Sequence, residues 1–230
     1  MHGSPADINA DALSATASAL RGDGARVLEM PWDLSMLDPI EPNFTRIEAE
    51  VGPVDILVNM TGGPPPTPAA GVSEDLWSKQ FQSMVLSVIK ITDRALPGMR
   101  QRKWGRIVTS ASSGVVAPIP NLGVSNALRS TLVGWSKTLA REVAADGITA
   151  NIVVPGRIAT ARIRALDEAR GAREKLRLED VVAQSLESIP AGRYGVPEEY
   201  GDVVAFLASR RASYVTGSIV RIDGGYIPNI

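Results

Sequence analysis

The chain contains no cysteine and only one histidine, His2, among its 230 residues. The absence of cysteine excludes disulfide bonds, a thiol nucleophile and thiolate metal ligands. One imidazole beside the amino terminus cannot anchor a site built on histidine. The composition therefore excludes disulfide-stabilised, thiol-dependent and imidazole-based classes of protein.

The chain also lacks an excess of either charge and any long apolar run. Its 24 Lys and Arg residues balance 25 Asp and Glu residues, and aromatic residues make up 5% of the chain. Without a basic patch or an aromatic platform, we expect no binding to nucleic acid or to an anionic membrane. No run approaches the roughly 20 apolar residues of a membrane span, and no signal peptide opens the chain. We predict a soluble, cytoplasmic protein that acts on a small neutral or modestly charged molecule.

Hydrophobic residues make up 44% of the chain, enough at this length for one sizeable core, so we predict a single domain over residues 1–230. Short apolar runs alternate with longer amphipathic stretches, a pattern that predicts a parallel β-sheet with helices on both faces. The runs read as strands are residues 25–30, 54–58, 106–109, 149–154 and 218–222. The stretches read as helices are residues 10–20, 39–51, 73–102, 125–145 and 197–208.

Two segments interrupt this alternation. Residues 63–68 form a proline-rich stretch that predicts a stiff, extended loop. Residues 161–189 are rich in Arg and Glu at helical spacing, and two interpretations remain open for them. They form either a lid over a substrate or a solvated helical excursion with no role in binding.

Several motifs lie where the predicted strands end. Asn59 closes one strand and is followed by Gly62, where a missing Cβ lets the chain pass close to a flat ligand. Pro155 and Gly156 turn the chain sharply at the end of another strand, and Thr160 stands just beyond. Ligands bind at the carboxyl ends of the strands in open α/β sheets, so we predict a binding site at this edge.

The order of these motifs resembles the short-chain dehydrogenases/reductases over nearly the whole chain. The resemblance rests on residues 55–62, on residues 105–113 leading into Ser112, on residues 151–160, and on the carboxyl-terminal segments 192–199, 206–209, 214–217 and 223–225. These last segments are similar to the 3-oxoacyl-acyl-carrier-protein-reductase-like branch. The resemblance implies a three-layer, Rossmann-like doubly wound parallel sheet, NAD or NADP as cofactor, a small carbonyl or alcohol substrate, and a homodimer or homotetramer.

The same resemblance implies roles for individual residues. Asp33 is similar to the acid that receives the adenine amino group, and Thr160 is placed to bind a carboxamide. Asn59, Gly62, Pro155 and Gly156 complete the expected cofactor-binding set.

The amino-terminal part departs from the family. Members begin with a strand, a Thr-Gly-x-x-x-Gly-x-Gly turn, a helix and a second strand, and none of these is recognisable before Ala6. We therefore expect a domain without the first strand, the glycine-rich turn and the second strand. Such a domain lacks the usual pyrophosphate site, and strands beside the missing central one have unpaired edges. The residue that separates NAD from NADP is not identifiable.

The catalytic positions depart as well. Ser112, or Ser113 if the alignment is shifted by one, matches the serine that holds the carbonyl oxygen. Leu122 and Asn126 stand for the family's Tyr-x-x-x-Lys pair, at a spacing from Ser112 that is shorter than usual, and Met84 stands for the asparagine of the proton relay. Leucine has no proton to donate, and all four tyrosines lie in the last fifth of the chain. This chain closely resembles one branch of the family. Members of that branch have Leu-x-x-Ser-Asn at the position of residues 122–126 and Gly-Gly-Pro-Pro-Pro after the fourth strand.

Arg129 lies three residues beyond Asn126, on nearly the same helix face. Either its guanidinium supplies the charge of the missing lysine, or it is a surface or interface residue. As an acid it is excluded, because the pKa of arginine is above about 12.

Two functions from different classes remain open. The first is NAD(P)-dependent hydride transfer on a ketone or secondary alcohol, similar to 3-oxoacyl reduction, by a degenerate active site. The second is a non-catalytic scaffold or ligand-binding subunit that pairs through residues 81–99 and 124–143. Two interpretations are open for the apolar stripe on the second of these segments, which is either a seam between subunits or ordinary core. The stripe consists of Leu132, Val133, Trp135 and Leu139.

Overall fold

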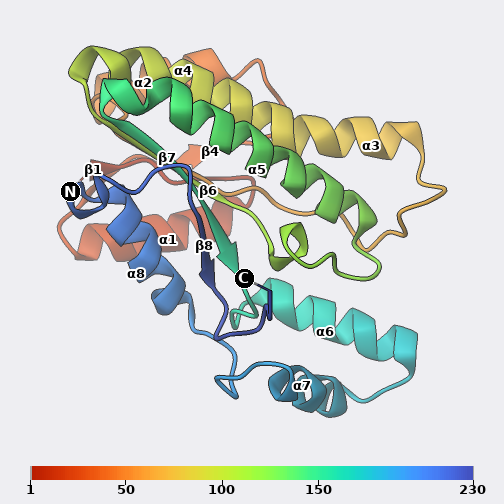
Figure 1. Cartoon of the computed structure of the whole chain (residues 1–230). Coiled ribbons are helices and arrows are strands. Elements are labelled where there is room, and N and C mark those ends of the chain that lie inside the picture. Colours follow the sequence, from red (N-terminus) through yellow and green to blue (C-terminus); the bar gives the residue numbers. More distant parts are fainter. Residues whose placement is uncertain (1, 230) are drawn as a thin grey trace.

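The computed structural model describes residues 2–229, and its centre is a parallel sheet of four strands. The strands are β5 (Ile56–Asn59), β6 (Gly105–Ser110), β7 (Ile148–Pro155) and β8 (Ile219–Ile222), hydrogen-bonded in that order (Figure 1). In register, Ile107 of β6 lies beside Leu57 of β5 and Ala150 of β7. Every residue of β6 is buried, as expected for a parallel sheet covered on both faces.

Consecutive residues of β6 show how the two faces are covered. Ile107 packs in a cluster with residues of α2 (Ile40–Glu50), α4 (Ser87–Arg102) and α5 (Gly123–Val143). Val108 faces the opposite side and packs against Leu207 of α8 (Pro197–Ala208). Because successive side chains of a strand point to opposite faces, the protein has three layers. The prediction of a Rossmann-like α/β fold is therefore confirmed.

The apolar stripe predicted on α5 belongs to the core. Leu132 and Leu139 are buried within the chain, in contact with residues of the preceding helices. The seam interpretation is wrong for these two residues, because side chains that are fully packed inside one subunit have no surface to offer a second.

The long helix that precedes α5 in the sequence has three parts. It begins as α3 (Glu74–Phe81) and continues through a π-helical turn, Gln82–Leu86, into α4.

The amino-terminal segment forms a separate parallel ribbon. Strands β1 (His2–Gly3) and β2 (Ala6–Asp7) pair with β3 (Arg26–Val27) and β4 (Met30–Pro31), respectively. Helix α1 (Ala10–Gly22) contacts this ribbon and buries Leu13 and Ala17. The expectation that no strand precedes the first helix is thus wrong. The strand consists of two-residue pieces with Pro5 between them, so the sequence contains no apolar run long enough to indicate it.

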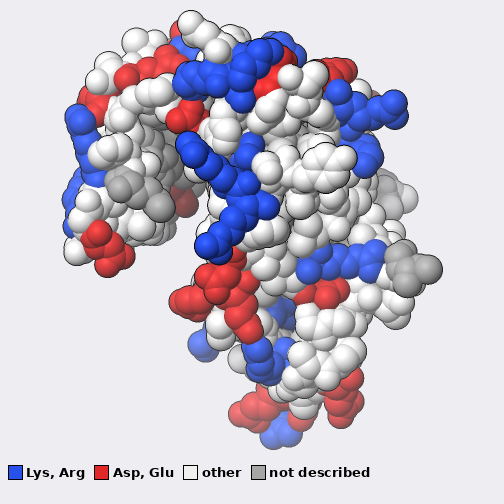
Figure 2. All heavy atoms as spheres, turned by 60° about the vertical axis from the view of Figure 1, so that its left-hand side comes forward, with Lys and Arg blue, Asp and Glu red and all other residues white. Residues whose placement is uncertain are grey.

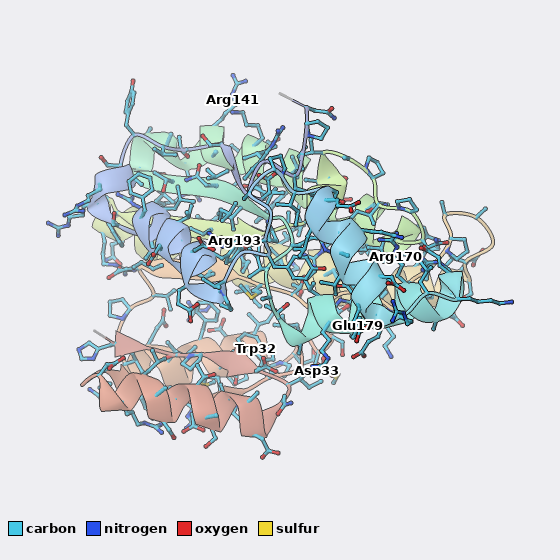
Figure 3. The ribbon with its side chains drawn as sticks, turned by 90° about the horizontal axis from the view of Figure 1, so that it is seen from below. Trp32, Asp33, Arg141, Arg170, Glu179 and Arg193 are labelled. Atoms are coloured by element: carbon cyan, nitrogen blue, oxygen red, sulfur yellow. The ribbon has the colours of Figure 1, made fainter. Side chains whose placement is uncertain are left out.

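Within residues 2–229 this ribbon is not hydrogen-bonded to the four-stranded sheet, so one edge of β5 is unpaired, as predicted. The side chains of Ile56 and Val58 on β5 are 47% and 42% exposed. Figure 2 shows the deep groove between the amino-terminal lobe and the rest of the molecule, and Figure 3 shows the ribbon and α1 as a layer of their own. The connection runs through Trp32, which is buried in the α2–α4 cluster.

Residues 161–189 form two helices beyond β7, α6 (Ala161–Glu174) and α7 (Leu178–Glu187), which pack on each other at one end of the molecule (Figure 1). The helical spacing is confirmed, and the role of a lid stays a prediction. Among the described residues, no helix is both long and apolar enough to cross a membrane.

Candidate functional site

Arg129 is the central residue at the carboxyl ends of β5 and β6. It projects from α5, is only 9% exposed, and makes no ion pair among residues 2–229. Its Nη2 donates to the carbonyl oxygens of Thr61 and Gly62 at 3.2 and 2.9 Å, and its Nη1 donates to the Ser110 carbonyl oxygen at 3.2 Å. A cation thus lies at the strand ends without a counterion.

The electrostatic surroundings of Arg129 are unusual for an arginine. Burial lowers the pKa of its guanidinium, and the charge of Arg162 lowers it further, while Tyr200 acts in the opposite direction. An arginine remains protonated despite such shifts, because its ordinary pKa is above about 12. The charge is therefore permanent and partly desolvated, which strengthens its interaction with any negative or partly negative group nearby.

The predicted pair of Leu122 and Asn126 makes no hydrogen bond to Arg129 or Ser112 among the described residues. Leu122 is the residue before the first turn of α5, where it lies in a bridge with Thr67. The side-chain nitrogen of Asn126 donates to the carbonyl oxygen of Ile119 at 2.9 Å, so this amide holds the loop before the helix.

Ser125 and Arg129 form a second pair at i, i+4 spacing on α5 and are 8% and 9% exposed. Residues four apart share one helix face in both pairs, but Arg129 is the residue that hydrogen-bonds to carbonyl oxygens at the strand ends. The short spacing from Ser112 to Leu122 is the signal in the sequence that a register three residues further along fits better. Ser125 offers a hydroxyl and Arg129 a cation at neighbouring turns of α5.

Ser112 follows β6 and precedes a short helical turn, Ser113–Val115. Its Oγ accepts a hydrogen bond from the Gly114 backbone N–H at 3.2 Å, and the residue is only partly buried. Its hydroxyl hydrogen remains available to a ligand oxygen. Ser113 is buried, so Ser112 is the better candidate of the two. Met84 lies in the π-helical turn within an apolar cluster, where a methionine cannot relay protons.

Tyr200 is a site residue that the sequence did not indicate. It lies on α8, and its phenol donates to the Ser110 Oγ at 2.7 Å. Burial raises the pKa of the phenol, while the Ser110 bond and the charge of Arg129 lower it to a smaller extent. Its distance in sequence from the other site residues, 90 positions from Ser110, hides this contact, which only the packing of α8 on the sheet creates.

The predicted cofactor-binding residues are placed with different functions. Asn59 is buried, and its side-chain nitrogen donates to the hydroxyls of Thr92 and Thr109, both at 3.3 Å, so it ties β5 to its neighbours. Gly62 is exposed, and a Cβ added there meets no atom within 4 Å. The space beside Gly62, whose carbonyl oxygen binds Arg129, is therefore open. Asn59 has a structural role.

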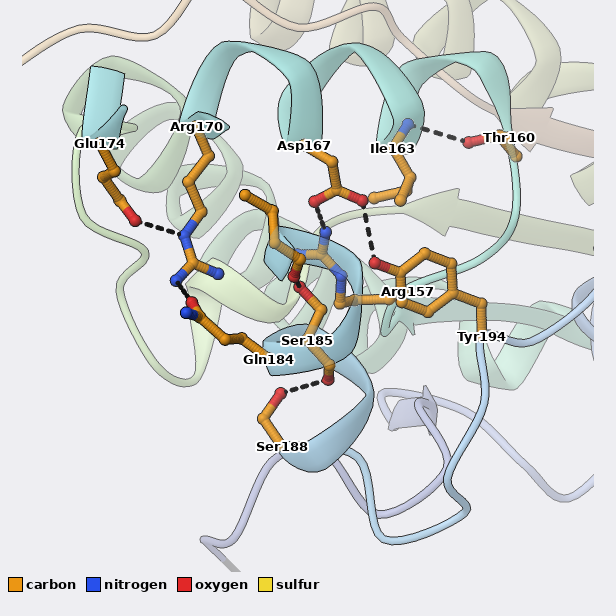
Figure 4. Close-up of polar contacts among 11 residues, drawn as sticks. Arg157, Thr160, Ile163, Asp167, Arg170, Glu174, Gln184, Ser185, Ser188 and Tyr194 are labelled. Carbon is orange, nitrogen blue, oxygen red and sulfur yellow. Dashed lines mark hydrogen bonds and ion pairs between the residues drawn. The ribbon is translucent and has the colours of Figure 1, made fainter. Parts of the chain in front are cut away.

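The remaining predicted residues support turns. Pro155 is the last residue of β7, and a Cβ on Gly156 would lie 2.6 Å from the Asp223 Cα, so glycine allows the chain to pass there. The Thr160 Oγ accepts from the Ile163 N–H and begins α6 (Figure 4). The exposed Asp33 carboxylate accepts from the Ser35 N–H at 2.8 Å, which lowers its pKa. No direct contact joins these residues to Arg129.

A second polar cluster lies below this edge, where α6 and α7 meet the loop before α8. The Asp167 carboxylate is paired with Arg157 and accepts from the Tyr194 phenol at 2.9 Å (Figure 4). The Arg157 guanidinium also lies over the Tyr194 ring, 5.2 Å from its centroid. An open cavity of about 640 Å³ adjoins the cluster. It is lined mainly by apolar groups, among them Ala161, Ile163, Leu178 and Val182.

The fold and the site together define a three-layer α/β protein with polar groups gathered at the carboxyl edge of a parallel sheet. Residues 5–227 match the family model described as enoyl-(acyl carrier protein) reductase. The chain belongs to this family of oxidoreductases, within the short-chain dehydrogenases/reductases.

Individual relatives support this assignment. The chain is 39% identical over 196 residues to the 3-oxoacyl-(acyl-carrier-protein) reductase of Salmonella typhimurium, across 84% of this chain and 75% of that protein. It is 34% identical to the acetoacetyl-CoA reductase of Shinella zoogloeoides, across 84% of this chain and 76% of that protein. L-sorbose reductase from Gluconobacter frateurii, solved with NADPH and L-sorbose, superposes with a TM-score of 0.92 at 28% identity, over 100% of this chain and 88% of that one.

Proposed function

We propose that this protein is an NAD(P)-dependent oxidoreductase that transfers hydride between a nicotinamide cofactor and a ketone or secondary alcohol. The observation that carries the proposal is the buried, uncompensated guanidinium of Arg129 at the ends of β5 and β6, with Ser125 one turn earlier on the same helix. The names of the relatives support the reaction class, because they include 3-oxoacyl and acetoacetyl reductases.

The residues at this edge fit the nicotinamide and ribose half of such a cofactor. The open space beside Gly62 admits a flat ring close to the backbone. Free N–H groups of Arg129 would bind ribose hydroxyls. When bound, a nicotinamide dinucleotide supplies or accepts the hydride.

The chain's own groups would act on the substrate oxygen. Ser112 donates a hydrogen bond to it from its partly exposed hydroxyl. Arg129 stabilises negative charge that develops on it. Neither Ser125 nor Arg129 is an efficient acid near neutral pH, so the proton must come from water or the substrate. Loss of a general acid typically costs about 10²- to 10⁴-fold in rate, and we therefore propose a slow enzyme with a degenerate active site.

A titration with NADH and NADPH tests the proposal, with nicotinamide fluorescence and thermal stability measured on the same samples. We expect saturation and a stability gain of about 2.7 kcal/mol at a hundredfold excess over Kd. The Arg129→Gln variant should raise the Kd at least about tenfold.

The matched control is Arg141→Gln, which changes an exposed arginine on the same helix that points away from the site (Figure 3). This control should leave the Kd unchanged. A folded wild-type protein that shows no saturation with either dinucleotide would overturn the proposal and favour the non-catalytic scaffold.

A further inference from the structure

We infer that Arg129 and Arg162 form a binding site for an oxyanion, a carboxylate or phosphate group of the ligand, at the carboxyl edge of the sheet. The inference deepens the proposed function and rests on it for the identity of the ligand. If the anion belongs to the substrate, the substrate is an anionic carbonyl compound. If it belongs to the cofactor, the site binds a cofactor phosphate. The site itself is defined by geometry.

The two guanidinium groups converge on one point beside Gly63. A Cβ built on this glycine would lie 3.4 Å from the Nη2 of Arg162 and 3.8 Å from the Nη2 of Arg129. Arg162 comes from the first turn of α6 and donates to the Pro64 carbonyl oxygen at 3.1 Å. Two like charges are thus held close together by backbone carbonyls of one loop. The absence of a side chain at Gly63 leaves the space between them free.

No acid compensates these charges among the described residues. The other arginines of α6 are all paired: Arg164 with Glu168, and Arg170 and Arg173 with Glu174. Arg162 forms no such pair, although it lies on the same charged helix. Like charges repel when they are held close together, and an anion bound between the two guanidinium groups would relieve this repulsion.

The remaining donors indicate the chemistry of that anion. Arg129 uses both N–H groups of its Nη2 and one of its Nη1 for carbonyl oxygens. A guanidinium has five N–H groups, so the second N–H of Nη1 and the N–H of Nε remain available. Arg162 is exposed and uses one. Two guanidinium groups with free donors match the several acceptor lone pairs of a carboxylate or phosphate.

The test uses calorimetric titrations in the absence of dinucleotide, with acetoacetate, its uncharged methyl ester and inorganic phosphate as probes. We expect saturable binding of at least one of the two anions and much weaker binding of the ester. Arg162→Gln should raise the Kd of the bound anion about tenfold or more, and Arg162→Lys should raise it less, because the charge is kept. Added salt should weaken the binding.

Arg164→Gln is the matched control, because Arg164 lies two residues away on the same helix and is paired with Glu168. Equal losses of affinity in the Arg162 and Arg164 variants would overturn the inference, as would the absence of anion binding by folded wild-type protein. Thermal unfolding of each variant shows that it is folded.

Competition identifies the source of the anion. Displacement of the bound anion by NADPH assigns the site to a cofactor phosphate, whereas anion binding to the NADPH-loaded protein assigns it to the substrate. Both results support the site. Failure of NADH and NADPH to bind, together with Arg162-dependent anion binding, would overturn the proposed function and leave the anion site standing.

Discussion

Replacement of Asp167 by asparagine should destabilise the protein far more than a surface substitution does. The carboxylate is 2% exposed, is paired with Arg157 and accepts from the Tyr194 phenol. Desolvation lowers the pKa of Arg157, but its bonds to Asp167 and Tyr194 outweigh this effect and raise it. The pair is thus held together against the cost of burial. Removing one partner of a buried ion pair typically costs about 3–5 kcal/mol, because the other charge remains buried without compensation.

Chemical denaturation followed by circular dichroism measures the effect. We expect a loss of about 3 kcal/mol in the free energy of unfolding, or roughly 6–12 °C in melting temperature for a chain of this size. The control is Glu168→Gln on the next residue of α6, whose 52% exposed side chain pairs with Arg164. This surface pair should contribute no more than about 0.5 kcal/mol.

A double-mutant cycle with Arg157→Met separates the ion pair from other effects of each substitution. If the two groups stabilise each other, the double variant loses less than the sum of the single losses. The reasoning is refuted if Asp167→Asn costs no more than Glu168→Gln, or if the losses at Asp167 and Arg157 are additive.

Three further substitutions test separate features of the structure. Tyr200→Phe should cost about 1 kcal/mol at neutral pH through the lost bond to Ser110. Burial raises the Tyr200 pKa above its ordinary value of 10.0, so the stability of the wild type should fall as pH rises above 10.0. Thermal unfolding of Tyr200→Phe should show a smaller fall, and equal falls in the two proteins would contradict the raised pKa. Hydrogen bonds from Arg193 and a backbone N–H lower the Glu199 pKa from 4.5 to about 2. The stability that Glu199 contributes is therefore present above pH 4.5 and is lost as pH falls toward 2. The melting temperatures of wild type and Glu199→Gln should converge between pH 4.5 and 2. A constant difference between them would contradict the lowered Glu199 pKa. Asn59→Ala leaves two buried hydroxyls without their donor and should lower the free energy of unfolding by about 1–3 kcal/mol, measured with urea; a change below about 0.5 kcal/mol would show that water replaces the amide.

The regular elements of the main body were predictable from local patterns. The helix predicted over residues 197–208 matches α8 in full, and the strand predicted over residues 149–154 lies within β7, Ile148–Pro155. Proline at the start of α8 is a local signal that acts through the backbone. The mostly apolar run in β7 is another, which reflects burial of the strand on both faces. The alternation of such elements was sufficient to predict the α/β class.

Only the first half of the amino-terminal ribbon was beyond this kind of reasoning, because its second half, β3 and β4, overlaps the strand predicted over residues 25–30. The strands of the first half are two residues long on each side of Pro5, and pairing with residues 26–31 defines them. A periodic pattern needs several residues before it differs from chance. Partner strands that are distant in sequence therefore decided this part of the fold.

The sequence by itself determined that the protein is an α/β relative of the short-chain dehydrogenases/reductases. The tertiary structure alone decided which residues meet at the ends of the strands. It turned Asn126 toward Ile119 and Arg129 toward the strand ends, brought Tyr200 to Ser110 from another helix, and placed Arg162 beside Gly63. The physical reason is that helix phase and packing orient each side chain. A shift of three residues along a helix preserves nearly the same face. The spacing from Ser112 is therefore one indication of the register, and contacts across the fold supply the other.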